Sequence, residues 1–125
     1  MIQQIENDKK NILAFKVAGK ITESEVKQTI AAIETAIQTR DRFNLYIEVA
    51  ELSGVEMAAM KERFAYIFSN YKQLLKKVKK VSLVSDKNWL QKFAEGLYYL
   101  IPSIEQKSFS FEEKEQARHF VGLVD

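Results

Sequence analysis

The amino-acid sequence predicts a single α/β domain: five strands in a mostly parallel sheet, with an antiparallel hairpin at its N-terminal edge, and four helices. Its 125 residues suit one domain that spans 1–125. Apolar patterns of strand period and helix period alternate along the chain, which is typical of parallel sheets with right-handed crossovers. Two strand-like runs precede the first helix, and this order favours a hairpin.

The predicted hairpin consists of two apolar runs around a polar turn. Ile2 and Ile5 begin a weak strand, and the polar turn spans 7–11. Residues 12–18 follow as an almost continuous apolar run, which indicates a more deeply buried strand.

The first helix is predicted over 23–39. Thr22 and Glu25 have the spacing of a capping box, in which each side chain satisfies a free backbone amide at a helix start. Apolar residues then recur every three or four positions, so one stripe of the helix should face the sheet. The stripe consists of Val26, Ile30, Ile33 and Ile37.

The middle of the chain predicts a strand, a loop and a long helix. Residues 45–50 are rich in β-branched and aromatic side chains and should form the strand, followed by a loop at 51–54. From Met57 the apolar period becomes helical, which predicts a second helix that extends to Val78.

The last third of the chain predicts two more strands and two more helices. A short strand at 81–84 precedes Asp86, which suits the N-cap of a third helix that Pro102 ends. A strand at 104–109 leads into a fourth helix at 112–124.

The sequence lacks the motifs that catalytic and cofactor sites need, so we expect no enzyme activity, no cofactor and no metal site. Four scattered glycines provide no phosphate-binding loop, and His119 is the single histidine of a chain without cysteine. Ser53 lacks the glycine two positions earlier that a nucleophile elbow requires. Acidic residues at 112–115 are explained by their place at a helix N-terminus, where negative charge is favourable.

Composition limits the compartment and the partners. The formal net charge of +2 is too small to demand a polyanionic partner, so no nucleic acid is expected. The absence of cysteine suits the reducing cytoplasm. No apolar run reaches the ~18 residues of a membrane-spanning helix. We therefore expect a cytoplasmic protein, with peripheral contact to a membrane as an option.

Positive charge is concentrated in one stretch. Residues 61–80 hold seven basic and one acidic residue, whereas acidic residues outnumber basic ones on both sides of it. Such a run is usually a solvated face, and its functional interpretation is attraction to an anionic membrane surface or an acidic partner. The predicted anionic-surface patch consists of Lys72, Lys76, Lys77, Lys79 and Lys80.

Aromatic residues are concentrated in the predicted second and third helices. The second helix has more apolar positions than one sheet face can bury, so something else should cover it. The candidates are the third helix, a second subunit, lipid, or an apolar ligand between the two helices. The residues predicted to bind such a ligand are Phe64, Phe68, Tyr71, Trp89, Phe93 and Tyr98.

The order of elements and three short motifs resemble the bacterial SpoIIAA-like family of STAS-type domains, over nearly the whole chain. The resemblance implies a small cytoplasmic domain with a β-α superhelical arrangement, no established catalysis, and membrane association or ligand binding. The motifs are Gly19-Lys20-Ile21-Thr22, Val84-Ser85-Asp86 followed by Trp89, and Glu113 with Glu115-Gln116-Ala117-Arg118.

The sequence departs from the better-known members of this family at one segment. Anti-anti-sigma factors carry a phosphorylated serine at the start of their second helix, where this chain has Glu56-Met57-Ala58-Ala59. The resemblance therefore does not imply a kinase-controlled sigma switch, and Ser53 does not take the place of that serine.

Three functional hypotheses follow from the sequence. The first is a non-enzymatic binding or regulatory module that engages a membrane surface or an amphiphilic small molecule through the second and third helices and the basic patch. The second is a protein interaction domain that acts as a homodimer through the surplus apolar surface. The third, an enzyme, lacks a convergent set of titratable groups in the sequence.

Overall fold

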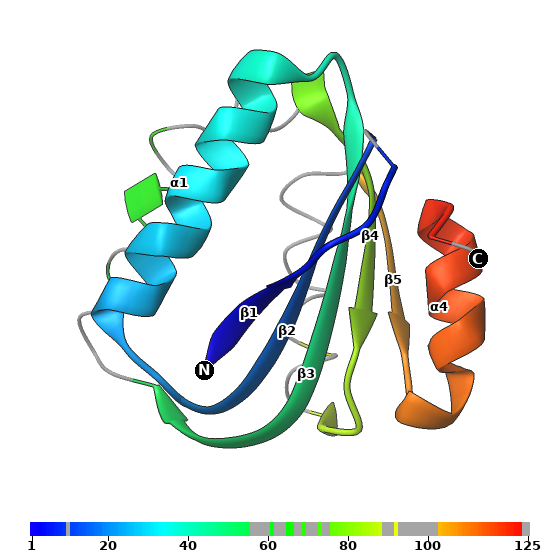
Figure 1. Cartoon of the computed structure of the whole chain (residues 1–125). Coiled ribbons are helices and arrows are strands. Elements are labelled where there is room, and N and C mark those ends of the chain that lie inside the picture. The colour runs from blue at the N-terminus through cyan, green and yellow to red at the C-terminus, as the bar shows by residue number, and fades with distance from the viewer. Residues whose placement is uncertain are drawn as a thin grey trace.

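The computed structural model of the chain places a five-stranded sheet between helices (Figure 1). It describes residues 1–9, 11–55, 61, 65–66, 69, 73, 76–88, 92 and 103–123.

The sheet follows the order of the strands in the chain, from β1 to β5. β1 pairs with β2 in antiparallel fashion, and each later strand pairs in parallel with its predecessor. The predicted mixed sheet with an antiparallel edge hairpin is therefore confirmed. The strands are β1 (Ile2–Ile5), β2 (Ile12–Ile21), β3 (Phe43–Val55), β4 (Val78–Val84) and β5 (Glu105–Phe109).

Both faces of the sheet are buried, which explains the continuous apolar run at the start of β2. Leu13 and Phe15 belong to the core cluster that contains Ala36 and Ile37 of the first helix. Ile12 and Ala14 belong to the cluster beneath the C-terminal helix on the other face. Side chains alternate between the faces of a strand, so a strand covered on both sides needs apolar residues at every position.

The first helix, α1 (Glu23–Thr39), has the bounds that the sequence predicts. The Thr22 Oγ1 accepts a hydrogen bond from the Glu25 backbone N–H at 3.2 Å, and the Glu25 Oε1 accepts one from the Thr22 N–H at 3.1 Å. The capping box predicted from the spacing is therefore confirmed.

The C-terminal helix is shorter than predicted. A single 3₁₀ turn, η1 (Phe111–Glu113), leads into α4 (Lys114–Val121), and the helix ends at Gly122 instead of continuing to 124. Gly122 has a φ of 87°, the left-handed conformation that glycine adopts most readily, and its N–H and that of Leu123 cap the last turn.

β3 is longer than predicted, because residues 51–54 extend the strand instead of forming a loop. They pair with the end of β2, where Leu52 lies opposite Gly19 and Gly54 opposite Lys20. The register shifts by one residue between these pairs, which leaves Ser53 as an extra residue in a bulge. Gly19, which lies at this register shift, has a φ of 68°, in the left-handed region.

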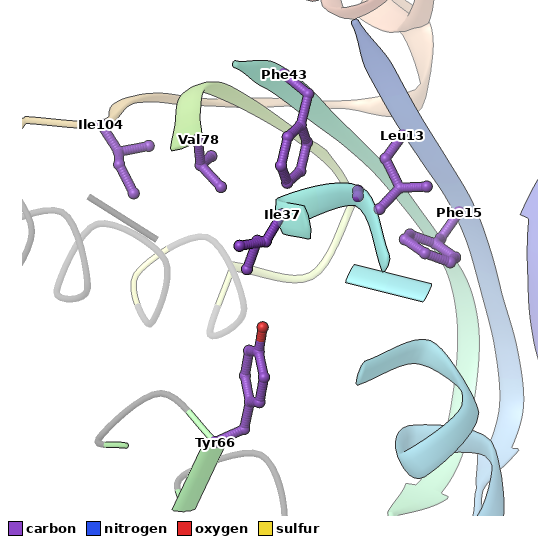
Figure 2. Packing of buried hydrophobic residues seen from close by; sticks show 8 residues of the cluster. Leu13, Phe15, Ile37, Phe43, Tyr66, Val78 and Ile104 are labelled. Atoms are coloured by element: carbon purple, nitrogen blue, oxygen red, sulfur yellow. The ribbon is translucent and has the colours of Figure 1, made fainter. Parts of the chain in front are cut away.

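α1 and α4 are the helices with assigned bounds in the described part of the chain, and the second and third predicted helices fall mostly outside it. Of the second, Lys61, Ala65, Tyr66, Ser69, Gln73, Lys76 and Lys77 are described and helical. Figure 2 shows Tyr66 in the core cluster on the α1 face, with its hydroxyl end directed toward Ile37.

Candidate functional site

The amino ends of β2, β3 and β4 meet at one edge of the sheet, next to the C-terminal end of α1 (Figure 1). Two basic side chains hold this edge together. The Arg40 Nη1 donates a hydrogen bond to the Ile12 carbonyl at 3.2 Å, and the Lys77 Nζ donates one to the Arg40 carbonyl at 2.9 Å. Lys77 therefore links the start of β4 to the C-cap of α1.

A bulge at the start of β4 separates its lysines. Phe43 pairs with Val78 and Leu45 with Val81, so Lys79 and Lys80 both lie opposite Asn44. The Asn44 Oδ1 accepts a hydrogen bond from the Lys80 N–H at 3.1 Å, and its Nδ2 donates one to the Val121 carbonyl at 2.8 Å. One carboxamide thus stabilises the bulge and ties it to the end of α4.

The bulge turns Lys80 toward the α4 face. Its Nζ lies 5.1 Å from the centre of the Phe120 ring and 4.0 Å from the Glu105 Oε2. Val78, two residues earlier, lies in the core cluster on the α1 face. In a regular strand these two residues would share a face.

A cavity of about 220 Å³ opens at the same edge. Among the described residues, its lining combines two cationic residues and two carboxamide residues with Phe43, and none of these is acidic. The lining residues are Asn11, Arg42, Phe43, Asn44 and Lys79.

The predicted basic patch is thus only partly a free cationic surface. Lys76 and Lys79 are exposed, whereas Lys77 and Lys80 bind groups of the protein itself. Lys72 lies outside the described residues.

The turn before β3 adds two cations, Arg40 and Arg42, that are absent from the basic patch predicted from the sequence. Their signal was available, because parallel neighbouring strands begin at the same edge of a sheet and a basic turn before one strand lies near the start of the next. Together with three lysines of the predicted patch they form a group of five cations, which we call the basic edge: Arg40, Arg42, Lys76, Lys77 and Lys79. None of the five forms a salt bridge with a carboxylate in the described part of the chain.

The six predicted ligand-binding aromatic residues all lie outside the described residues, so the pairing of the second and third helices stays a prediction. Tyr66, which the sequence analysis did not choose as a ligand-binding residue, is the described aromatic side chain of the second predicted helix.

A second polar cluster lies beneath α4, on the opposite face of the sheet from α1. Glu48 on β3 is a carboxylate that is only 3% exposed. Its Oε1 accepts a hydrogen bond from the Tyr46 hydroxyl at 2.6 Å and lies 3.3 Å from the Lys114 Nζ. Because each of these groups has a partner inside the fold, the cluster fastens α4 to the sheet.

Two buried tyrosines should make the fold sensitive to alkali. Burial, with a smaller contribution from the charge of Glu34, raises the pKa of Tyr66 to about 12. Burial also raises the pKa of Tyr46, and the hydrogen bond to Glu48 adds to the effect. The neutral phenol is therefore favoured in the folded state.

The stability from these tyrosines is complete below their unfolded pKa of about 10 and is lost as the pH rises toward the folded value. For Tyr66 the window runs from pH 10 to about 12. We expect the urea midpoint of the unchanged protein to fall steeply across this pH window. The urea midpoint of Tyr66→Phe should fall less steeply. If the urea midpoints of the two proteins depend equally on pH, the assignment to Tyr66 is wrong.

The acidic and histidine side chains and the helices of the described part of the chain bear on two other kinds of site. No three His, Cys, Asp or Glu side chains of this part of the chain gather as a metal-binding group. None of its helices is long and apolar enough to span a membrane.

The family model described as SpoIIAA-like matches residues 12–122 of this chain. Comparison with curated proteins gives no match.

Solved structures share the fold at low sequence identity. An uncharacterised DUF3478-family protein with a SpoIIAA-like fold from Shewanella loihica PV-4 matches with a TM-score of 0.72 and 21% identity, over 97% of this chain and 92% of that one. The anti-sigma factor antagonist SpoIIAA in its unphosphorylated form matches with a TM-score of 0.61 and 14% identity, over 95% and 98%. The Bacillus cell fate determinant SpoIIAA in its phosphorylated form matches with 0.58 and 16%, over 93% and 97%.

Proposed function

The chain belongs to the SpoIIAA-like family, and on that premise we propose that it is a non-enzymatic binding module that docks on an anionic membrane surface through its basic edge. One observation carries this proposal. The five cations gather at one edge of the sheet without a salt bridge to any described carboxylate. A basic residue near anionic headgroups contributes about 1 kcal/mol, so such a group supports reversible attachment.

The apolar part of the proposed contact comes from the sequence. Aromatic side chains of the predicted second and third helices would enter the interfacial region or hold an amphiphilic molecule, while the basic edge attracts the headgroups. These side chains are the six aromatic residues named above: Phe64, Phe68, Tyr71, Trp89, Phe93 and Tyr98.

The proposed regulation does not include phosphorylation. The solved relatives include an antagonist of an anti-sigma factor, with unphosphorylated and phosphorylated forms among them. Residues 56–59 of this chain are Glu-Met-Ala-Ala and offer no hydroxyl there. Attachment to a cytoplasmic leaflet would instead be controlled by lipid charge.

Vesicle sedimentation tests the proposal. We expect retention on phosphatidylglycerol-containing vesicles that falls as sodium chloride rises from about 0.05 to about 0.5 M, because salt screens exposed charges. The triple variant Arg42→Gln, Lys76→Gln, Lys79→Gln should bind at least tenfold more weakly. A control variant with the same charge change at exposed lysines elsewhere, Lys16→Gln, Lys20→Gln, Lys87→Gln, should lose much less.

Trp89 provides a second readout in the same experiment. It is the only tryptophan of the chain, so its emission reports on the predicted third helix without any substitution. We expect a blue shift on anionic vesicles, since an indole that enters the interface leaves water.

The outcomes separate the membrane proposal from its alternatives. Equal retention of the triple and control variants would remove the basic edge from the contact. Retention that is equal on neutral vesicles would remove the role of charge. No retention on either vesicle, with a dimer mass in sedimentation, would favour the homodimer alternative.

A further inference from the structure

We propose that the cavity between Arg42 and Lys79 binds a phosphoryl group. The cavity has a volume of about 220 Å³, and its described lining consists of two cationic residues, two carboxamide residues and Phe43, none of them acidic. The phosphoryl group could belong to a lipid headgroup, and in that case the inference rests on the proposed membrane contact. Binding of free phosphate tests it separately.

The bulge places the Lys79 side chain at the cavity. Two residues of β4 lie opposite the single residue Asn44, so Lys79 is the additional residue of the strand. The residues on either side of it lie on opposite faces of the sheet. Val78 packs in the core on the α1 face, and Lys80 lies over the Phe120 ring on the α4 face. Lys79 itself is exposed and lines the cavity together with Arg42, which directly precedes β3.

The two cations of the cavity differ from three of the basic groups around them. Arg40 and Lys77 donate to backbone carbonyls, and Lys80 lies beside Glu105. Arg42 and Lys79 make no hydrogen bond or ion pair with any described residue. Their donors are therefore available to a ligand, while the neighbouring contacts hold the backbone beneath them in place.

The donors available in the cavity suit phosphate oxygens. A guanidinium binds two oxygens of a phosphate in parallel, and an ammonium adds a point charge. Asn11 can add a neutral amide donor. The Asn44 carboxamide already bonds Lys80 and Val121, so it provides a fixed wall.

The cavity is small and partly open to solvent. Sites for whole drug-sized molecules have volumes of about 300–1,000 Å³, whereas this cavity is smaller. It suits one phosphoryl group whose remaining part extends into solvent, as in a lipid headgroup or a soluble phosphate ester.

Titration with inorganic phosphate tests the site without a membrane. At constant ionic strength we expect chemical shift changes in NMR spectra at Asn11, Arg42 and Lys79. Each of Arg42→Gln and Lys79→Gln should weaken binding about tenfold, since each removes a charged donor. Lys16→Gln, on an exposed site of β2, is the matched control and should bind as the unchanged protein does.

Vesicles of matched surface charge identify the source of the phosphoryl group. Phosphatidic acid exposes a phosphomonoester, whereas phosphatidylglycerol does not. A preference for phosphatidic acid that Arg42→Gln and Lys79→Gln both abolish supports a lipid headgroup. Phosphate binding at the cavity without that preference supports a soluble phosphate ester and keeps the site.

The site and the membrane contact can fail independently. Shift changes that are spread evenly over exposed lysines, or that chloride reproduces, would overturn the phosphoryl site even if salt-sensitive vesicle binding persists. Localised phosphate binding without any vesicle retention would keep the site and overturn the membrane contact.

Discussion

Replacement of Lys114 by methionine is expected to destabilise the fold by about 2–3 kcal/mol. The ammonium of Lys114 is the cation 3.3 Å from Glu48, whose side chain is 4% exposed. Loss of one partner of a buried pair costs about 3–5 kcal/mol, because the other charge stays buried without compensation. Lys114 is itself partly exposed, so water replaces some of the lost interaction. The expected cost is therefore about 2–3 kcal/mol, below the range for a fully buried pair.

The same substitution at an exposed ion pair is the control for this prediction. Lys27 lies 3.1 Å from Glu23 one turn earlier on α1, with both side chains largely exposed. Pairs of this kind contribute about 0.3–0.5 kcal/mol, so Lys27→Met should cost far less in urea unfolding. Replacement of Glu48 and Lys114 together should recover part of the loss. Equal costs for Lys114→Met and Lys27→Met would contradict the role of Glu48 as a buried anchor.

Phe43→Ala is expected to be the most damaging single substitution, at about 3–5 kcal/mol. The ring is 1% exposed and packs in the cluster with Leu13, Ile37 and Val78 (Figure 2). Truncation removes its apolar contacts and leaves a void, because close-packed surroundings relax only in part. A loss of this size should lower the melting temperature by about 9–25 °C, at about 3–5 °C per kcal/mol for a domain of this length.

Two further substitutions provide comparisons for the cost of Phe43→Ala. Phe43→Leu keeps most of the volume and should cost about 1.5 kcal/mol or less. Phe111→Ala removes the same atoms from a half-buried ring in η1 and should cost less than Phe43→Ala. If Phe43→Ala and Phe111→Ala shift the urea midpoint equally, Phe43 is not the central residue of the α1-side core.

The elements that the sequence predicts well are those determined by local chemistry. Thr22 and Glu25 determine the start of α1 through contacts three residues apart. The apolar run 12–15 predicts a deeply buried strand, and in the structure both faces of that strand lie in core clusters. Gly122 carries a similar local signal, yet the sequence pattern predicts a helix that continues to 124.

The features that the sequence does not reveal depend on partners far along the chain. The bulge at Lys79 arises from the register against Asn44, and no glycine marks it. The burial of Glu48 depends on α4, which supplies Lys114 more than sixty residues later. Arg42 joins the basic edge through the pairing of β3 with β4, so charge counted along the chain locates only part of the cationic surface.

The agreement between chain order and strand order has a kinetic consequence. Because every strand from β2 onward pairs with its predecessor, each new strand finds its template already synthesised. Loop closure between neighbours is then limited to one crossover at a time, which favours rapid, stepwise assembly during translation. α4 follows β5 and covers a sheet that is already complete, so a nascent chain should expose the Tyr46 face to chaperones until α4 has been synthesised.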